Sequence, residues 1–242
     1  MAVRRTARTQ GKPLLSDDVW ALLRSANETL AQRRETVLHG HTAPITDVAF
    51  SPDGLIVASA SEDGSARLWD FSVPAPGGGG ALRGHIGAAY VVAFSPDGTR
   101  LATGGDDGKV YLWRLDAPDP ATTGVALKRH ESGVHVLAWH PDGEQLASGD
   151  DAGMIALWRV DAPEAPASYR AAHEAPITAL VFDHADSPNL WSGADDRLAR
   201  QWALRDDGGL AKVRTLDEHV GGVTSVAVAE DGRWAATGTT SG

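Results

Sequence analysis

Histidine, a hydroxyl residue, aspartate and tryptophan recur together along this chain at fixed spacing. Three sets show the whole pattern: His41, Ser59, Asp63 and Trp69; His85, Thr103, Asp107 and Trp113; His173, Ser192, Asp196 and Trp202. Hydroxyl, imidazole and carboxylate groups are what serine hydrolases combine, so hydrolysis is the first chemistry to consider. The sets recur about every 44 residues, however, and an enzyme needs such a triad only once. We therefore interpret them as structural and predict no catalytic residue.

Other reactive patterns are weak. His39 and His41 lie two residues apart, but the chain has no cysteine and no third ligand close by, so we predict no metal site. The segment Pro76–Gly80, which contains four consecutive glycines, lacks the flanking strand and helix of a phosphate-binding loop. No G-x-S-x-G elbow occurs. The sequence indicates neither an enzyme nor a cofactor.

The spacing of the tryptophans shows how these residues are positioned. Trp69, Trp113, Trp158 and Trp202 are 44, 45 and 44 residues apart. His41, His85, His130 and His173 precede them at a similar period, and His219 continues this period without a tryptophan to follow it. A regular period of this length indicates repeated supersecondary units. Each unit contains short apolar runs separated by turns, such as ITDVAF, SPDG and LIVASAS in the first. Runs of this kind favour antiparallel strands.

From Thr36 to the end the chain resembles the WD-repeat β-propeller family. The matching motifs are Gly40-His41 with Trp69-Asp70, Gly84-His85 with Trp113, and the two SPDG turns. The resemblance implies an all-β propeller with blades of four strands. It also implies that each set of polar residues is a structural tetrad, in which the indole donates to the hydroxyl, the hydroxyl to histidine, and histidine to aspartate.

The predicted fold is four full blades plus a partial fifth, preceded by one helix. In the first blade we expect the strands Thr46–Phe50, Leu55–Ala60, Ala66–Phe71 and Ala81–Arg83, with a flexible insertion at residues 74–80. The fifth unit should hold only Thr224–Val228 and Trp234–Gly238. Thr36–Leu38 has the character of an outer strand that closes a ring, so we expect the chain to be part of a larger ring.

Two units depart from the pattern. In the third, His130, Ser148 and Trp158 are present, but alignment puts Ala152 where aspartate belongs, and Arg129 replaces the glycine before the histidine. We expect this tetrad to be incomplete, with Asp151 as the carboxylate that could reach His130. In the fifth, Thr237 matches the hydroxyl and Ser241 stands in place of aspartate.

The first 35 residues form a separate region. Residues 16–35 predict one amphipathic helix, capped by Ser16 and apolar along one face. It either packs on the propeller or docks on another domain. Residues 1–40 carry seven basic and four acidic residues, while the repeats are strongly acidic. We place the boundary between residues 35 and 36.

Acidic residues precede the tetrad aspartates in the loops between the second and third strands. Glu62, Asp106, Asp150 and Asp195 should be exposed and form an arc at one end of the propeller. Aspartate also simply suits tight turns; the functional interpretation is a seat for a basic segment of a partner protein. Tyr90 and His135 are further candidates at the same end. Neither shows a partner in the sequence.

Composition limits the function. A net charge of −10 argues against nucleic-acid binding, and no run reaches the ~18 apolar residues of a membrane helix. The absence of cysteine suggests the cytoplasm. The favoured function is a non-catalytic protein-interaction scaffold within a larger regulatory or signalling protein, similar to the propellers of large bacterial signalling proteins. The alternative is a propeller enzyme, hydrolase-like, with its active site in the central channel. The partner, the number of blades and any attached domain stay open.

Overall fold

The computed structural model describes residues 37–73, 78–164, 166–184, 188–205, 207–229 and 232–241. By compactness the chain divides into two units, Met1–Val37 and Leu38–Gly242. The amphipathic helix predicted for residues 16–35 lies outside the described residues. All the strands among the described residues belong to the second unit.

Within the described residues the strands form four sheets of four strands and one of two. The first sheet contains β1 (Ile45–Phe50), β2 (Ile56–Ser61), β3 (Ser65–Asp70) and β4 (Gly78–Arg83). The second contains β5 (Ala89–Phe94), β6 (Arg100–Gly105), β7 (Lys109–Arg114) and β8 (Val125–Lys128), with the 3-10 helix η1 (Pro120–Thr122) before β8. The third contains β9 (Val134–Trp139), β10 (Gln145–Asp150), β11 (Met154–Arg159) and β12 (Ser168–Ala171). The fourth contains β13 (Ile177–Phe182), β14 (Asn189–Ala194), β15 (Ala199–Leu204) and β16 (Leu210–Leu216), and the fifth β17 (Val223–Val228) and β18 (Ala235–Thr239).

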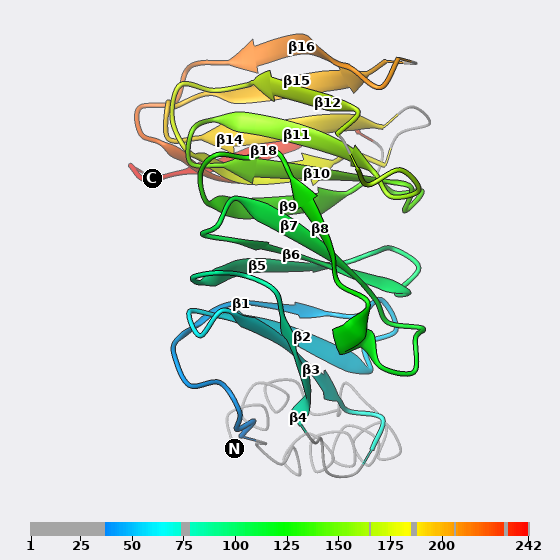
Figure 1. The fold of residues 1–242 in the computed structure, drawn as a ribbon. Coiled ribbons are helices and arrows are strands. Elements are labelled where there is room, and N and C mark those ends of the chain that lie inside the picture. The colour runs from blue at the N-terminus through cyan, green and yellow to red at the C-terminus, as the bar shows by residue number, and fades with distance from the viewer. Residues whose placement is uncertain are drawn as a thin grey trace, which may run out of the picture. The chain divides into compact units, whose positions relative to one another are not determined.

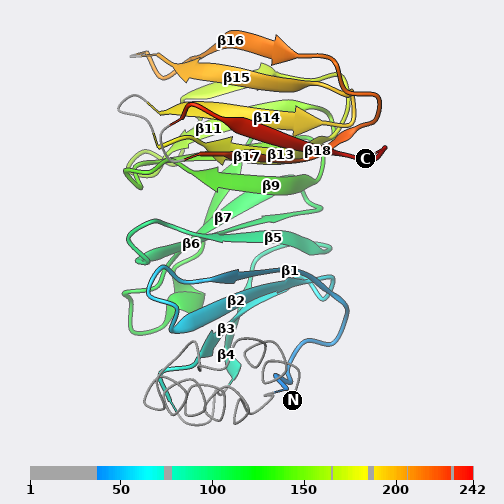
Figure 2. The ribbon, with the colours of Figure 1, turned by 180° about the vertical axis from the view of Figure 1, so that it is seen from behind.

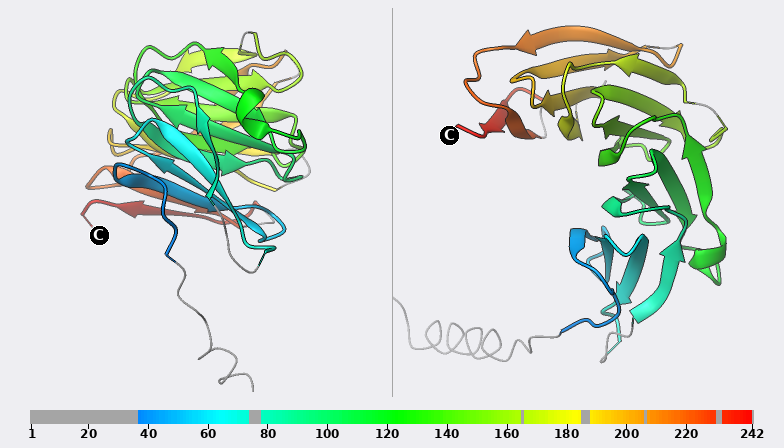
Figure 3. Two further views of the ribbon diagram at one scale, coloured as in Figure 1. Left: turned by 60° about the horizontal axis from the view of Figure 1, so that its bottom comes forward. Right: turned by 60° about the vertical axis from the view of Figure 1, so that its left-hand side comes forward.

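Each sheet is an antiparallel meander whose strands pair in chain order. The first strands of successive sheets contact one another, from β1 to β5, β9, β13 and β17. The sheets therefore follow one another in chain order along the second unit (Figure 1), and the view from behind shows the first strands (Figure 2). Within this unit the sheets lie side by side along an arc, with the first strands on its concave side (Figure 3).

In the first two sheets the turn between the first and second strands depends on serine, aspartate and glycine. In the first sheet Ser51 Oγ donates to Asp53 at 2.6 Å and accepts the backbone N–H of Ile56 at 2.9 Å. Gly54 has a φ of 72°, a backbone conformation that residues other than glycine rarely adopt. These contacts explain why the SPDG motif marks the turn in the sequence.

Every first strand contains a β-bulge at its second residue, where the pairing with the second strand shifts by one. A bulge adds an unpaired residue and redirects its side chain. The bulged residues are Thr46, Tyr90, His135, Thr178 and Thr224. The bulges thus place five side chains at equivalent positions on the concave side of the unit.

The hydrophobic core lies between neighbouring sheets rather than inside one. One apolar layer joins the first and second sheets, another the second and third, and another the third and fourth. The middle strands supply small residues, such as the alanines of β2, which let the sheets pack closely. Each layer contains a tetrad tryptophan: Trp113, Trp158 or Trp202.

The first sheet has one uncovered face. Val48 in β1 is 59% exposed, whereas Val92, at the same position in β5, is 4% exposed. Phe50 and Trp234 are also largely exposed. A side chain at this position is buried only where a neighbouring sheet packs on it. The difference in exposure between Val48 and Val92 therefore shows how much of the valine such a neighbour covers.

The strands agree with the sequence analysis except at the edges. The fifth unit contains the two expected strands, within one residue of the predicted bounds. The expected strand at Thr36–Leu38 is wrong in its described part, because Val37 and Leu38 lie outside any strand. The expected flexible insertion is wrong at Gly78–Gly80, which belongs to β4, where Gly78 pairs with Trp69. The number of blades in a complete ring stays a prediction.

Candidate functional site

In the second sheet four side chains form one chain of hydrogen bonds. Trp113 Nε1 donates to Thr103 Oγ1 at 3.2 Å, and His85 Nε2 lies 2.9 Å from the same oxygen. His85 Nδ1 lies 2.8 Å from Asp107 Oδ1. All donors are satisfied when Nδ1 carries the imidazole hydrogen and the hydroxyl donates to Nε2. We call this arrangement a tetrad.

The first and fourth sheets contain the same tetrad, with contacts of 2.7–3.0 Å. Their members are His41, Ser59, Asp63 and Trp69, and His173, Ser192, Asp196 and Trp202. In both sheets the hydroxyl is buried. Because each hydroxyl and each imidazole nitrogen is already engaged, these residues have a structural role and are not free to act as nucleophile and base.

The third tetrad is complete, and the expectation that Asp151 would substitute in it is wrong. His130 Nδ1 lies 2.6 Å from Asp150 Oδ2, while Ser148 Oγ contacts His130 Nε2 at 2.7 Å and accepts Trp158 Nε1 at 2.8 Å. Asp150 is the last residue of β10, two positions before Ala152. Its other oxygen accepts the backbone N–H groups of Ala152 and Met154, so the carboxylate also organises the following turn.

Three of the tetrad carboxylates, those of Asp63, Asp107 and Asp196, have a lowered pKa, which favours the charged form. Burial of Asp63 would raise its pKa, but hydrogen bonds from Ser65, the Thr42 N–H and His41 outweigh it, and the pKa is well below the usual range. Burial also acts to raise the pKa of Asp107 and of Asp196. Hydrogen bonds, first among them those from histidine, outweigh this effect, so both pKa values are lowered. Three or more donors to one carboxylate favour its ionised form.

The fourth tetrad has an additional cation. The Arg200 guanidinium donates to the Ala172 carbonyl and to Asp196, and lies 2.9 Å from His173 Nδ1. Burial lowers the pKa of His173, Asp196 raises it in part, and the charge of Arg200 lowers it further. Burial and Arg200 therefore favour the neutral form of His173. In the fifth unit His219 contacts Thr237 at 2.8 Å, and its Nδ1 lies 3.1 Å from the Arg197 carbonyl in place of a carboxylate.

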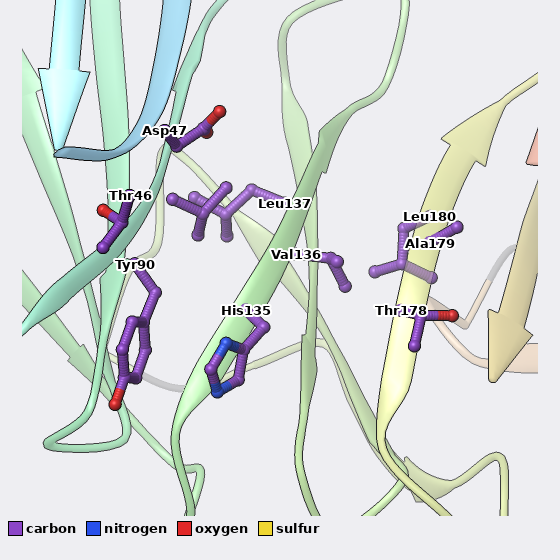
Figure 4. A pocket seen from close by; sticks show the side chains of 10 residues that line it. Thr46, Asp47, Tyr90, His135, Val136, Leu137, Thr178, Ala179 and Leu180 are labelled. Atoms are coloured by element: carbon purple, nitrogen blue, oxygen red, sulfur yellow. The ribbon is translucent and has the colours of Figure 1, made fainter. Parts of the chain in front are cut away.

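A pocket of about 340 Å³ lies among the first strands of the first four sheets. Figure 4 shows Tyr90 and His135 side by side at one end of it, with Thr46 and Thr178 on either side. The two rings stack across the second and third sheets, with centroids 4.1 Å apart and planes 18° from parallel. The bulges in β5 and β9 make this stack possible, since they direct both side chains to the same place.

The structure provides partners for Tyr90 and His135 that the sequence does not show. The Tyr90 hydroxyl donates to Asp106 at 3.0 Å, and His135 Nε2 lies 3.1 Å from Asp151 Oδ2. In both sheets the carboxylate comes from the loop after the second strand. Burial raises the pKa of the Tyr90 phenol, and Asp106, Asp151 and Glu62 raise it further, so the hydroxyl remains a donor.

The acidic arc differs from the expected one at one residue. Glu62, Asp106 and Asp195 are exposed, as predicted, but Asp150 is fully buried in its tetrad. Asp151 occupies the fourth position, and its side chain is 49% exposed. The sequence has Asp150-Asp151 where the other units have an acidic residue followed by the tetrad aspartate. Counted from the tetrad hydroxyl, however, Asp151 and not Asp150 is equivalent to Glu62. We use the name acidic arc for Glu62, Asp106, Asp151 and Asp195.

The hydroxyls beside the pocket are engaged by backbone carbonyls. Thr46 Oγ1 donates to the Ala89 carbonyl at 2.6 Å, and Thr178 Oγ1 donates to the Val223 carbonyl. Each bond joins one sheet to the next. Asp47 also spans two sheets, because it accepts the Val92 N–H at 3.0 Å, and burial raises its pKa. No group of three metal-ligating side chains occurs in the described part of the chain, and no helix there is long and apolar enough to cross a membrane.

The model of the "WD domain, G-beta repeat" family matches residues 32–70, 80–114, 122–159 and 210–242, together more than half of the chain. This chain belongs to the WD-repeat family. Among its relatives, Nuclear distribution protein PAC1 of Arthroderma otae is 54% identical over 39 residues, which are 16% of this chain and 8% of the relative. COMPASS component SWD1 of Saccharomyces cerevisiae is 46% identical over 39 residues, 16% of this chain and 9% of the relative.

A serine-threonine kinase receptor-associated protein of Gallus gallus is 59% identical over 34 residues, 14% of this chain and 10% of the relative. Each matching segment is about as long as one WD repeat, so the chain spans about a tenth of these relatives or less. They are eukaryotic proteins. The expected similarity to bacterial signalling propellers therefore stays a prediction.

The fourth WD repeat lies outside the family matches, yet its geometry is complete. Residues 160–209 are not covered, although they contain β13, β14 and β15 and a full tetrad. The turn after β13 has Asp183 where the first two repeats have serine. Asp183 Oδ1 accepts the Asn189 N–H at 2.9 Å, as Ser51 Oγ accepts that of Ile56. A carboxylate can thus replace the serine of the turn without loss of the hydrogen bond.

Sequence reasoning missed Asp151, Thr46, Thr178 and Asp47 as residues of this region. The spacing from Ser148 to Asp151 could have identified the first, since it equals the spacing from Ser59 to Glu62. Nothing in the sequence marks the other three, because their roles depend on bulges and on contacts between sheets.

Proposed function

We propose that this chain is a non-catalytic protein-interaction scaffold, and that the acidic arc with Tyr90 and His135 binds a basic segment of a partner protein. The observation that carries the proposal is the stack itself: two aromatic rings, each hydrogen-bonded to a carboxylate of the arc, at the edge of an open pocket. Lysine and arginine bind both to carboxylates and over aromatic faces.

The charges support this assignment. Glu62 and Asp151 come from different sheets, yet both raise the pKa of Tyr90, so their fields converge on the stack. Exposed carboxylates at an interface mainly direct association and select the sign of the partner's charge. The pocket next to the stack has room for one long side chain.

The described side chains give catalysis less support. His135 contacts a carboxylate and a ring, and neither Thr46 nor Thr178 directs its hydroxyl at it. A nucleophile and base within hydrogen-bond reach would be the minimum for a hydrolase. We therefore favour binding over the hydrolase alternative.

The test is binding of a fluorescent arginine- and lysine-rich peptide, measured by anisotropy. Asp106→Asn with Asp151→Asn should weaken binding roughly tenfold. The matched control is Asp116→Asn with Asp161→Asn, which removes the same charge at the opposite ends of the same sheets, where the two aspartates pair with Arg114 and Arg159. Equal weakening by both pairs of changes, or no binding by the wild type, would contradict the proposal.

The proposed setting is a larger regulatory or signalling protein of the cytoplasm. The chain has no cysteine and so needs no disulfide, which is compatible with a reducing compartment. Microscopy of the full-length protein carrying a fluorescent tag tests the location, since a secreted protein would be found outside the cell.

A further inference from the structure

A second pocket, of about 300 Å³, lies between the second and third sheets and is lined by basic residues. Its wall contains Lys109 at the start of β7, Lys128 at the end of β8 and Arg129 in the next loop, together with Asp107, Gly108 and His130. Asp107 and His130 are engaged in their tetrads. Lys109 is paired with Asp107, while Lys128 and Arg129 are exposed, so the latter two are the cations most available to a ligand.

Two lysines stand opposite each other in this wall. Lys109 and Lys128 are direct partners in the β7–β8 ladder, and the whole chain has only four lysines. Like charges at directly opposed positions are unfavourable in a sheet, so the pairing of these two lysines with each other does not stabilise the ladder. Lys109 Nζ lies 3.1 Å from Asp107 Oδ2, and the hydrogen bond that the lysine donates to this carboxylate raises the pKa of Lys109. Lys128 is exposed and makes no ion pair with any residue that the structure describes.

Arg129 can occupy its position because the third sheet differs from the first and the second. A Cβ atom on Gly40 or Gly84, its counterparts, would lie 2.7 Å from the side chain of Arg67 or Tyr111. The third sheet has Ala156 at that point of its third strand, which leaves space. The Arg129 guanidinium lies over the Tyr169 ring, 4.5 Å from its centroid, so the ring supports it while the residue stays exposed.

We propose that Lys109, Lys128 and Arg129 form a binding site for a phosphate group on a side chain of a partner protein. A supported guanidinium offers a planar pair of donors to phosphate oxygens, and two ammonium groups add charge from the neighbouring strands. The site takes a single phosphate rather than a nucleic acid, because a net charge of −10 and the nearby acidic arc repel a polyanion. It stands independently of the basic-segment proposal.

The experiment compares a fluorescent peptide carrying one phosphoserine with its unphosphorylated and glutamate forms, using the whole chain and anisotropy. We expect Lys128→Gln and Arg129→Gly each to weaken phosphopeptide binding roughly tenfold. Glycine is the residue at this position in the first and second sheets, and Lys128 is exposed, so both variants should fold. Lys212→Gln removes one positive charge from β16 of the fourth sheet and should leave binding within about twofold.

The outcomes separate the possibilities. Competition by inorganic phosphate, with loss only in the Lys128 and Arg129 variants, supports a phosphate site. Equal affinity for the glutamate peptide would show a carboxylate site and overturn the assignment. Equal loss with Lys212→Gln would show unspecific charge attraction. Tighter binding of a single-stranded oligonucleotide than of the phosphopeptide would point to nucleic acid instead.

Discussion

The second and third sheets build the same tetrad from different sequence positions. In the second, the carboxylate comes from the turn, four residues after Thr103; in the third, it comes from the last residue of the strand, two residues after Ser148. The distances to the histidine are nevertheless similar, at 2.8 and 2.6 Å. The fold requires a carboxylate oxygen beside the histidine Nδ1, and an aspartate at either of two positions along the chain can supply it.

The two solutions differ in burial. The side chains of His130 and Asp150 are fully buried, whereas that of Asp107 is 8% exposed and also pairs with Lys109. A charged group without access to water depends entirely on its partners. The third sheet should therefore be more sensitive to loss of its carboxylate than the second.

The largest effect is expected from Asp150→Ala. Loss of this carboxylate leaves the His130 imidazole and two backbone N–H groups without their acceptor, and should lower the free energy of unfolding by roughly 3–5 kcal/mol. Asp107→Ala should lower it by about 1–3 kcal/mol, since water can reach that site. Asp151→Ala, at an exposed residue, should change it by about 0.5 kcal/mol or less. Urea unfolding checks all three, and a larger loss for Asp151 than for Asp150 would restore the original interpretation of the sequence.

A smaller effect is expected when the carboxylate is moved. The double change Asp150→Ala with Ala152→Asp places aspartate where the second sheet has it, and the new side chain should accept the Met154 N–H as Asp63 accepts that of Ser65. We expect it to recover roughly 1–2 kcal/mol of the loss from Asp150→Ala in the same urea experiment. Ala152→Asp alone serves as the control, because it adds a charge beside an intact tetrad and should not stabilise. No recovery would show that the third sheet has become specialised for Asp150.

The smallest effect is expected in the pH dependence of stability, where His173 of the fourth sheet differs from the tetrad aspartates. Because burial and Arg200 lower the pKa of His173 in the folded state, the unfolded chain binds this proton first. Stability from this group is present above the unfolded pKa of about 6.5 and is lost as pH falls below it. Arg200→Ala should reduce that loss between pH 7 and 5, measured by thermal unfolding. The lowered pKa values of Asp63, Asp107 and Asp196 affect stability at lower pH. The stabilisation from these carboxylates is lost only as pH falls below about 4.

The sequence predicted the repeats, most strands and the tetrad positions because each depends on local periodicity. Trp113 and Thr103, for example, follow from alternation along paired strands. Asp150 could not be predicted by counting residues, since a strand end and a turn can bring an oxygen to the same point. The stack of Tyr90 on His135 depends on two bulges and on the spacing of two sheets, and neither leaves a mark in the sequence.

The layered core has a consequence for how the molecule opens. Each apolar layer joins only two neighbouring sheets, so the stability of one sheet depends on the layers at its two faces, as in a linear array of coupled elements. The second and third sheets have a layer on both sides, while β1 exposes Val48 and Phe50 on one side. Amide hydrogens of the first sheet should therefore exchange with solvent through smaller, more frequent openings than those of β6 and β10.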